Sequence, residues 1–266
     1  MIKLIATDMD GTWLNDNKTY DQALFDQILE QVEKQDIKFV IASGNQYENL
    51  KTRFPKVVDK LYFIAENGAL VAKGNQILHV DHISDEEFKT MIQITEEIKN
   101  PVVVAGLRSA YVRTKDGAAY HKEMEKYFKH ITVVNSFDEI KDNIFKISFD
   151  TNVNELAGLI QKIRQNYPKF EVVAGGQDSV DVQAKGMSKA VGLRYLSQSL
   201  NINPEEMVAF GDGENDNAML EYVGLSYATS AALEGTRKIV DQVIGSSNDS
   251  AVQKEIIKLL NANQKD

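Results

Sequence analysis

Short apolar segments that end in polar turns recur near both ends of the chain, and this pattern limits the possible folds most. Residues 2–7 are mostly apolar and rich in β-branched side chains, and the turn Asp8-Met9-Asp10-Gly11-Thr12 follows them. Residues 38–42 and 61–65 repeat the apolar pattern, and helical spacing of apolar residues over 21–35 separates the first two runs. This order of strand, helix and strand predicts βαβ units and a buried parallel sheet.

The C-terminal third repeats the rhythm. A predicted helix over 188–200 precedes the apolar run 207–211, which leads into Asp212-Gly213-Glu214-Asn215-Asp216. Further strands are expected near 223–228 and 242–244, and further helices near 214–221, 231–238 and 249–262. We therefore expect both ends of the chain to build one α/β core, a doubly wound, Rossmann-like parallel sheet.

The middle of the chain has a different pattern. Helical spacing over 84–98, 117–129 and 152–166 alternates with strand-like runs at 101–106, 110–114, 144–150, 170–174 and 179–183. Gly175-Gly176-Gln177-Asp178 is a hairpin signal between the last two runs. About 100 residues are too many for a loop. We predict an inserted α+β domain over 83–185, with 1–82 and 186–266 forming the core.

Composition excludes several classes of protein. The 266 residues are 43% hydrophobic and 26% charged, as in ordinary globular proteins. A net charge of −9 disfavours nucleic acid as a partner. The absence of cysteine excludes disulfides and thiolate metal sites. No apolar stretch approaches the roughly 20 residues that span a bilayer, and the N-terminus lacks a signal-peptide pattern. We expect a cytoplasmic protein without membrane partners, of undetermined oligomeric state.

Acidic side chains follow two of the predicted strands. In an open parallel sheet, groups beyond the carboxyl ends of the strands share one crevice, so Asp8, Asp10, Asp212 and Asp216 should converge. Two like charges about 4 Å apart repel by about 4 kcal/mol at an effective dielectric constant of 20. A cation must therefore balance the cluster, and hard oxygen ligands favour Mg²⁺.

The remaining polar residues suit phosphoryl transfer. A carboxylate beside such a metal can attack phosphorus and form an acyl phosphate, and a second acid can protonate the leaving oxygen and later activate water. Asp8 and Asp10 lie two positions apart in one turn. Ser43 and Lys189 would supply a neutral donor and a positive charge for the phosphoryl oxygens. Lys185 is the rival for this lysine role.

Together these segments resemble the four motifs of the haloacid dehalogenase superfamily: Asp8-Met9-Asp10-Gly11-Thr12, Ser43-Gly44, Lys189, and Gly211-Asp212-Gly213-Glu214-Asn215-Asp216. Their order and spacing resemble the Cof-type (class IIB) phosphatases, which carry a large α+β cap domain between the second and third motifs. Glu66-Asn67-Gly68 also fits a signature of this subgroup. The resemblance extends over essentially the whole chain.

The resemblance implies a role for each motif residue. It makes Asp8 the nucleophile and Asp10 the general acid and base. Mg²⁺ would be held by Asp8, the main-chain carbonyl of Asp10 and Asp212. Asp216 would support metal-bound water or Lys189. Ser43 and Gly44 would bind phosphate with Lys189, and Asn215 would contact phosphate or orient Lys189.

The expected function is Mg²⁺-dependent hydrolysis of a small phosphorylated metabolite. Asn45 stands where many relatives have arginine, and Ser43-Gly44-Asn45-Gln46 resembles a subset described as sugar phosphatases. The cap residues Gly175, Gly176 and Asp178 are candidates for substrate contact. Trp13 is either a lid over the site or a packing residue. A phosphomutase or phosphotransferase with the same aspartyl phosphate, and a non-catalytic phospho-acceptor signalling protein, remain alternatives.

Overall fold

The computed structural model describes residues 1–175 and 178–264 and divides the chain into two compact units. Unit 1 comprises Met1–Ser43, Lys56–His79 and the chain from Ser188 onward, and unit 2 comprises Gly44–Pro55 and Val80–Met187. This division groups Gly44–Pro55 with the inserted segment, whereas the sequence pattern assigned it to the core.

Unit 1 is an α/β unit built on one eight-stranded sheet in the order β14-β13-β12-β1-β2-β3-β4-β5. Its strands are β1 (Leu4–Thr7), β2 (Lys38–Ala42), β3 (Tyr62–Ala65), β4 (Leu70–Lys73), β5 (Gln76–Val80), β12 (Met207–Gly211), β13 (Leu225–Ala228) and β14 (Gln242–Val243). Its helices are α1 (Gln22–Lys34), α6 (Lys189–Leu200), α7 (Asn217–Tyr222), α8 (Glu234–Ile239) and α9 (Ala251–Asn263).

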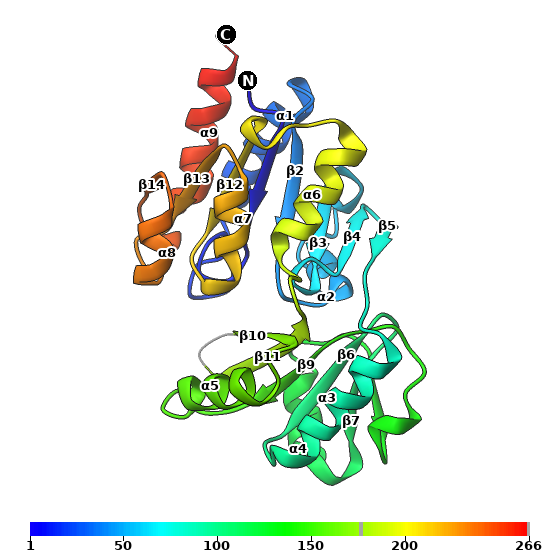
Figure 1. Ribbon diagram of the computed structural model, residues 1–266. Coiled ribbons are helices and arrows are strands. Elements are labelled where there is room, and N and C mark those ends of the chain that lie inside the picture. The colour runs from blue at the N-terminus through cyan, green and yellow to red at the C-terminus, as the bar shows by residue number, and fades with distance from the viewer. Residues whose placement is uncertain (176–177, 265–266) are drawn as a thin grey trace. The chain divides into compact units, whose positions relative to one another are not determined.

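Helices cover both faces of this sheet (Figure 1). Leu193 and Leu196 of α6 and Met219 of α7 pack against Ala6 and Ala209 on one face. On the other face, α1 lies beside α9. The side chain of Asp21 caps α1 by accepting a hydrogen bond from the Leu24 N–H. Parallel strands covered on both faces confirm the doubly wound α/β fold.

One edge of the unit 1 sheet departs from the parallel pattern. β3 and β4 pair antiparallel, and β5 continues the edge beyond β4. β4 and β5 were not predicted from the sequence, although Asn67-Gly68 is a recognised hairpin signal. The short turn Glu66–Gly68 joins β3 to β4.

Unit 2 has a six-stranded sheet in the order β10-β11-β9-β6-β7-β8. Its strands are β6 (Val102–Gly106), β7 (Ala110–Arg113), β8 (Ile131–Val134), β9 (Ile144–Asp150), β10 (Phe170–Ala174) and β11 (Ser179–Ala184). Its helices are α2 (Tyr47–Thr52), α3 (Asp85–Glu97), α4 (Ala118–Met124) and α5 (Leu156–Asn166). β10 and β11 pair antiparallel, which agrees with the hairpin signal between them.

One helix prediction in this unit was too long. α4 ends at Met124 rather than near 129. The N–H groups of Lys126 and Tyr127 bond three residues back, to Glu123 and Met124. This tightening lets the chain turn toward β8, where Ile131 packs on the same apolar cluster as Met124.

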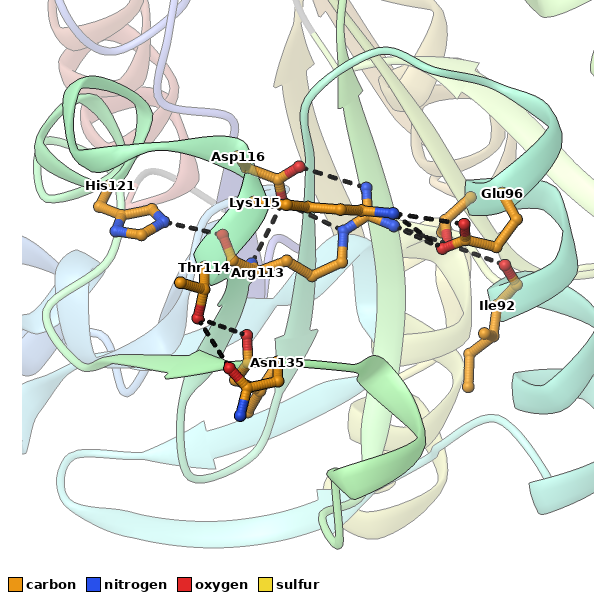
Figure 2. Close-up of polar contacts among 10 residues, drawn as sticks. Ile92, Glu96, Arg113, Thr114, Lys115, Asp116, His121 and Asn135 are labelled. Atoms are coloured by element: carbon orange, nitrogen blue, oxygen red, sulfur yellow. Dashed lines mark hydrogen bonds and ion pairs between the residues drawn. The ribbon is translucent and has the colours of Figure 1, made fainter.

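A buried arginine joins several parts of unit 2 (Figure 2). The guanidinium of Arg113, at the end of β7, donates to Glu96 of α3 at 2.8 Å and to Asp116 at 3.2 Å. It also lies 4.8 Å from the ring centroid of Phe137. The carbonyl of Arg113 is 2.9 Å from Nε2 of His121 on α4. Arg113 therefore ties α3, α4 and the turn after β7 together.

Candidate active site

The predicted site residues meet where three neighbouring strands of unit 1 end. β1 pairs in parallel with β12 on one side and with β2 on the other. Thr7, the last residue of β1, is level with Phe210 and Ile41. Asp8, Asp212 and Ser43 come directly after these strand ends, so the fold brings them to one edge of the sheet.

Lys189 is the lysine of this site. Its ammonium is completely buried and donates to Asp8 Oδ1 and to Asp216 Oδ1, both at 2.5 Å. Its rival Lys185 belongs to unit 2 and donates to the Pro168 carbonyl at 3.2 Å. The structure therefore places Lys189, and not Lys185, beside the clustered acids.

Three carboxylates crowd around this one ammonium. Asp8, Asp212 and Asp216 each place an oxygen within 4.8 Å of the others. Asp216 is anchored by the N–H groups of Asp212 and Gly213, which donate to its Oδ2 at 2.9 Å. The Thr12 hydroxyl donates to Asp212 Oδ1 at 2.7 Å. Fixed donors thus hold the acids together despite their mutual repulsion.

The crowding changes the proton affinity of these groups. Burial, followed by the charge of Asp216, raises the pKa of Asp212 to about 6. Burial raises the pKa of Asp8 well above its usual value; the Lys189 charge opposes this, and Asp216 and Asp212 add to it. Burial lowers the pKa of Lys189, but Asp216 and Asp8 outweigh that effect and raise it. The cluster therefore has a deficit of positive charge.

Gly11 lets the first and last motifs approach each other. Its φ is +79°, and a Cβ at this position would lie 2.4 Å from Asp212 Oδ2. Gly211 plays a similar part at the end of β12, where a Cβ would lie 2.6 Å from the Asp216 Cβ. Side chains at either glycine would push apart the acids that form the cluster.

Asp10 lies at the solvent edge of the site. Its carboxylate is partly exposed and pairs with the Lys18 ammonium at 2.7 Å. Its negative charge is close enough to contribute to the raised pKa of Asp212. Exposed ion pairs contribute only about 0–1 kcal/mol to stability. The ion pair with Lys18 is therefore too weak to hold the Asp10 side chain in this position.

The predicted phosphate-binding residues lie around a turn whose role the sequence did not reveal. Ser43 is buried, and its carbonyl accepts the Asn67 N–H at 3.1 Å. The Asn215 amide donates from Nδ2 to Asn67 Oδ1 at 3.3 Å. Asn67 therefore links two expected site residues. Its sequence signal was the Glu66-Asn67-Gly68 signature.

Unit 2 contains a polar cluster that the sequence analysis also missed. Lys146 on β9 donates to Asp181 Oδ2 on β11 at 2.6 Å and to the Gly44 carbonyl at 3.0 Å. Ser148 donates to Asp181 Oδ1 at 2.6 Å. Lys146 and Asp181, which are charged residues flanked by apolar ones in the strand sequences IFKISFD and SVDVQA, were the available signal.

The candidate substrate loop of unit 2 lies beside this cluster. The Gly175 N–H donates to the Ser179 carbonyl, and a Cβ on Gly175 would lie 2.8 Å from Asp181 Oδ1. Asp178 is exposed, and its carbonyl accepts the Thr151 N–H. Gly176 lies outside the described residues.

Trp13 packs in the core of unit 1. It is fully buried and makes edge contacts with Phe25 and Phe39 at ring-centroid distances of 5.3 and 5.6 Å. This burial supports the packing role over a lid.

Among the described residues, none of the helices is both long and apolar enough to cross a membrane.

Comparison with known proteins supplies the family. A protein-family model with the description haloacid dehalogenase-like hydrolase matches residues 5–256 of the sequence. The chain belongs to the haloacid dehalogenase superfamily. It is 35% identical over 262 residues to the 5-amino-6-(5-phospho-D-ribitylamino)uracil phosphatase YbjI of Escherichia coli K12, covering 97% of this chain and 96% of that protein. This relationship identifies the chain as a haloacid dehalogenase phosphatase of the Cof type.

Solved structures agree with this fold. SMU.1108c of Streptococcus mutans UA159 is 30% identical, with a TM-score of 0.91 and coverage of 98% of this chain and 100% of that chain. The class IIB sugar phosphatase BT4131 has a TM-score of 0.80 at 22% identity, covering 97% of this chain and 98% of that chain. At that identity the second likeness concerns the fold alone.

Proposed function

We propose that this phosphatase is Mg²⁺-dependent and hydrolyses small phosphate monoesters, with sugar and polyol phosphates as the preferred class, through an aspartyl phosphate on Asp8. The observation that carries the proposal is the buried arrangement of Asp8, Lys189 and Asp216 beside Asp212. It joins a nucleophile, a fixed positive charge and a cluster of acids at one edge of the sheet.

The acids fit a hard divalent cation. Three carboxylates share a volume in which their oxygens lie within 4.8 Å, and Lys189 supplies one compensating charge. We propose that Asp8, Asp212 and the main-chain carbonyl of Asp10 hold Mg²⁺, with Asp216 in support. When bound, the ion would neutralise charge on the acids and on a phosphoryl oxygen.

Hydrolysis would proceed in two steps. In the first, an Asp8 carboxylate oxygen attacks phosphorus, the bond from phosphorus to the ester oxygen breaks, and Asp10 donates its proton to that oxygen. In the second, Asp10 takes a proton from water, the resulting hydroxide attacks phosphorus, and the bond to Asp8 breaks. Ser43, Lys189 and Asn215 would bind the phosphoryl oxygens in both steps.

Relatives suggest the substrate class. YbjI and its Bacillus subtilis counterpart YcsE, 24% identical to this chain, are both named for a phosphate ester on a ribityl chain. Ser43-Gly44-Asn45-Gln46 independently favours phosphorylated sugars. The shared chemistry is a phosphate on a primary hydroxyl of a polyhydroxylated carbon chain.

We also propose that unit 2, with 83–185 as its main part, is a cap that selects the leaving group. Lys146, Ser148 and Asp181 offer donors and acceptors of the kind that recognise hydroxyl groups. Gly175, Gly176 and Asp178 belong to the same proposed specificity region.

The decisive experiment combines a substrate panel with an Asp8→Asn variant. We expect the wild-type protein to release phosphate from sugar and polyol phosphates with Mg²⁺, and to lose activity in excess EDTA. Asp8→Asn should lower kcat at least about 1,000-fold, because an amide is a poor nucleophile. Asp26→Asn, at an exposed position on α1, is the matched control.

Isotopic water tests the fate of the phosphoryl group. Hydrolysis in H₂¹⁸O should place the label in the released phosphate. Turnover by Asp8→Asn at the wild-type rate would refute the assignment of Asp8 as the nucleophile. Full activity in excess EDTA would refute the requirement for a metal ion. Transfer of the phosphoryl group to a second sugar, without uptake of ¹⁸O from water, would identify a phosphomutase or phosphotransferase instead.

A further inference from the structure

The turn Glu66–Gly68 has an unusual backbone. Its three residues all have positive φ, at 50°, 54° and 106°, and the first two are not glycine. Glu66 and Asn67 are nevertheless each only 2% exposed. L-residues avoid this region, and such conformations persist where the surrounding structure imposes them, often at functional sites.

This turn contacts three segments of the active site within unit 1. The Asn67 N–H donates to the Ser43 carbonyl at 3.1 Å, and Asn67 Oδ1 accepts from Asn215 Nδ2 at 3.3 Å. A Cβ on Gly68 would lie 2.1 Å from the carbonyl oxygen of Ser188, the residue before Lys189. The turn therefore touches each segment that we assign to phosphate binding.

We propose that Asn67 is a positioning residue, which orients the Asn215 amide for the phosphoryl group; this inference rests on the proposed function. An amide nitrogen carries two hydrogens. Asn67 binds one of them and fixes the plane of the amide, so the second is available to a phosphoryl oxygen. Asn67 is not one of the residues proposed to hold the metal. Its loss should therefore weaken phosphate binding and leave Mg²⁺ binding unchanged.

The Asn67→Gly variant isolates the side chain. Glycine adopts positive φ without strain, so the turn and its N–H bond to Ser43 can remain while the acceptor for Asn215 is lost. Asn201→Gly is a matched control, because Asn201 ends α6 with φ 53° and ψ 49° and lies outside the proposed site. Thermal melts of both variants separate folding effects from binding effects.

Calorimetry with inorganic phosphate in the presence of Mg²⁺ gives a readout that does not depend on turnover. We expect Asn67→Gly to raise the Kd for phosphate about tenfold, the size expected for one hydrogen bond to a charged group. The KM for the best ester should rise in parallel. Asn201→Gly should leave both constants unchanged, and the Kd for Mg²⁺ should stay the same in both variants.

A double-mutant cycle tests whether Asn67 acts through Asn215. We expect the double variant Asn67→Gly/Asn215→Ala to bind phosphate no more weakly than Asn215→Ala alone. Additive losses of phosphate affinity in the double variant would overturn the inference. So would an unchanged phosphate affinity in Asn67→Gly, or a wild-type protein that does not bind phosphate. A wild-type protein that binds phosphate without turnover would refute the proposed function alone.

Discussion

Among single residues, Gly11 and Gly186 allow backbone strain to be separated from steric contact. Both have φ +79°, but a Cβ on Gly11 would lie 2.4 Å from Asp212 Oδ2, whereas a Cβ on Gly186 would meet no atom within 4 Å. Alanine at either position should incur a similar backbone cost of about 1 kcal/mol. Only alanine at position 11 should displace an acid of the site.

We therefore expect Gly11→Ala to lower kcat about 100-fold, the size typical of small displacements of reacting groups. Gly186→Ala should keep normal turnover, and its melting temperature should fall by the backbone cost alone. Steady-state kinetics and thermal melts of the two variants provide the comparison. Equal kinetics in both variants would show that contact with Asp212 is unimportant.

Asp150 in unit 2 should make stability depend on pH. Burial, and then the charges of Asp178 and Glu123, raise its pKa to about 6 from an ordinary value of 3.8. The folded protein thus holds a proton on Asp150 that the unfolded chain releases. The contribution of Asp150 to stability is therefore fully present below about pH 4 and is lost as pH rises through 6. Because Asp150 is only half-buried, we expect about 1 kcal/mol.

An Asp150→Asn variant should lack this dependence. Its melting temperature, relative to that of the wild-type protein, should rise between pH 4.5 and 7.5. Melts at several pH values test the expectation, and a constant difference across this range would count against it.

Between elements, Arg113 should be the main polar link inside unit 2. Its side chain and that of Asp116 are 5% and 8% exposed, whereas Glu96 is 59% exposed. Arg113→Ala would leave the Asp116 carboxylate buried without its guanidinium partner, with only the main-chain N–H of residue 113 still donating to it, at a cost of about 3 kcal/mol. Glu96→Gln removes only an exposed partner and should cost less than about 1 kcal/mol.

Hydrogen exchange of peptides from α3 measures this difference locally. Exchange should accelerate strongly in Arg113→Ala and change little in Glu96→Gln. Equal acceleration in both variants would place the stabilisation in the Glu96 pair instead.

The elements that the sequence predicted well are those in which local pattern and tertiary packing agree. The apolar strands 38–42 and 207–211 and the amphipathic helix α1 appear close to their expected bounds. The predicted helix over 117–129 was too long because the chain after Met124 changes to hydrogen bonds between residues three apart, which an apolar pattern does not reveal. β4 and β5 were missed because their apolar runs are short, and a local pattern does not show that such runs pair at the edge of the sheet.

The candidate site likewise contains residues that the sequence pattern could place and residues whose positions depend on the folded structure. Asp8 and Asp212 could be placed together because strand ends of a parallel sheet converge. Lys189 begins a helix instead, and it was included as a positive charge for the phosphoryl oxygens. The pairing of Asp10 with Lys18 depends on side-chain rotamers, which sequence does not specify. The role of Asn67 depends on a backbone conformation that is rare for its residue type.

For the whole molecule, Mg²⁺ should stabilise unit 1 selectively. Trp13, the single tryptophan, is buried in unit 1, so its fluorescence follows the unfolding of that unit. At about 100 times its Kd, Mg²⁺ should add about 2.7 kcal/mol to the free energy of unfolding. Asp212→Asn should remove most of this gain, and exchange in α3 should not respond. An unchanged Trp13 transition in the wild-type protein would contradict a metal site.

The position of β1 between β2 and β12 has a consequence for biosynthesis. Residues 8 and 212 lie close together beyond the ends of two paired strands but are translated far apart in time. A nascent chain that has not yet reached β12 lacks one flank of β1 and two of the clustered acids. Ribosome-bound fragments should thus be unable to consume cellular phosphate esters. By the proposed mechanism, catalytic competence should begin only once translation has passed Asp216 and the central strand has gained its second neighbour.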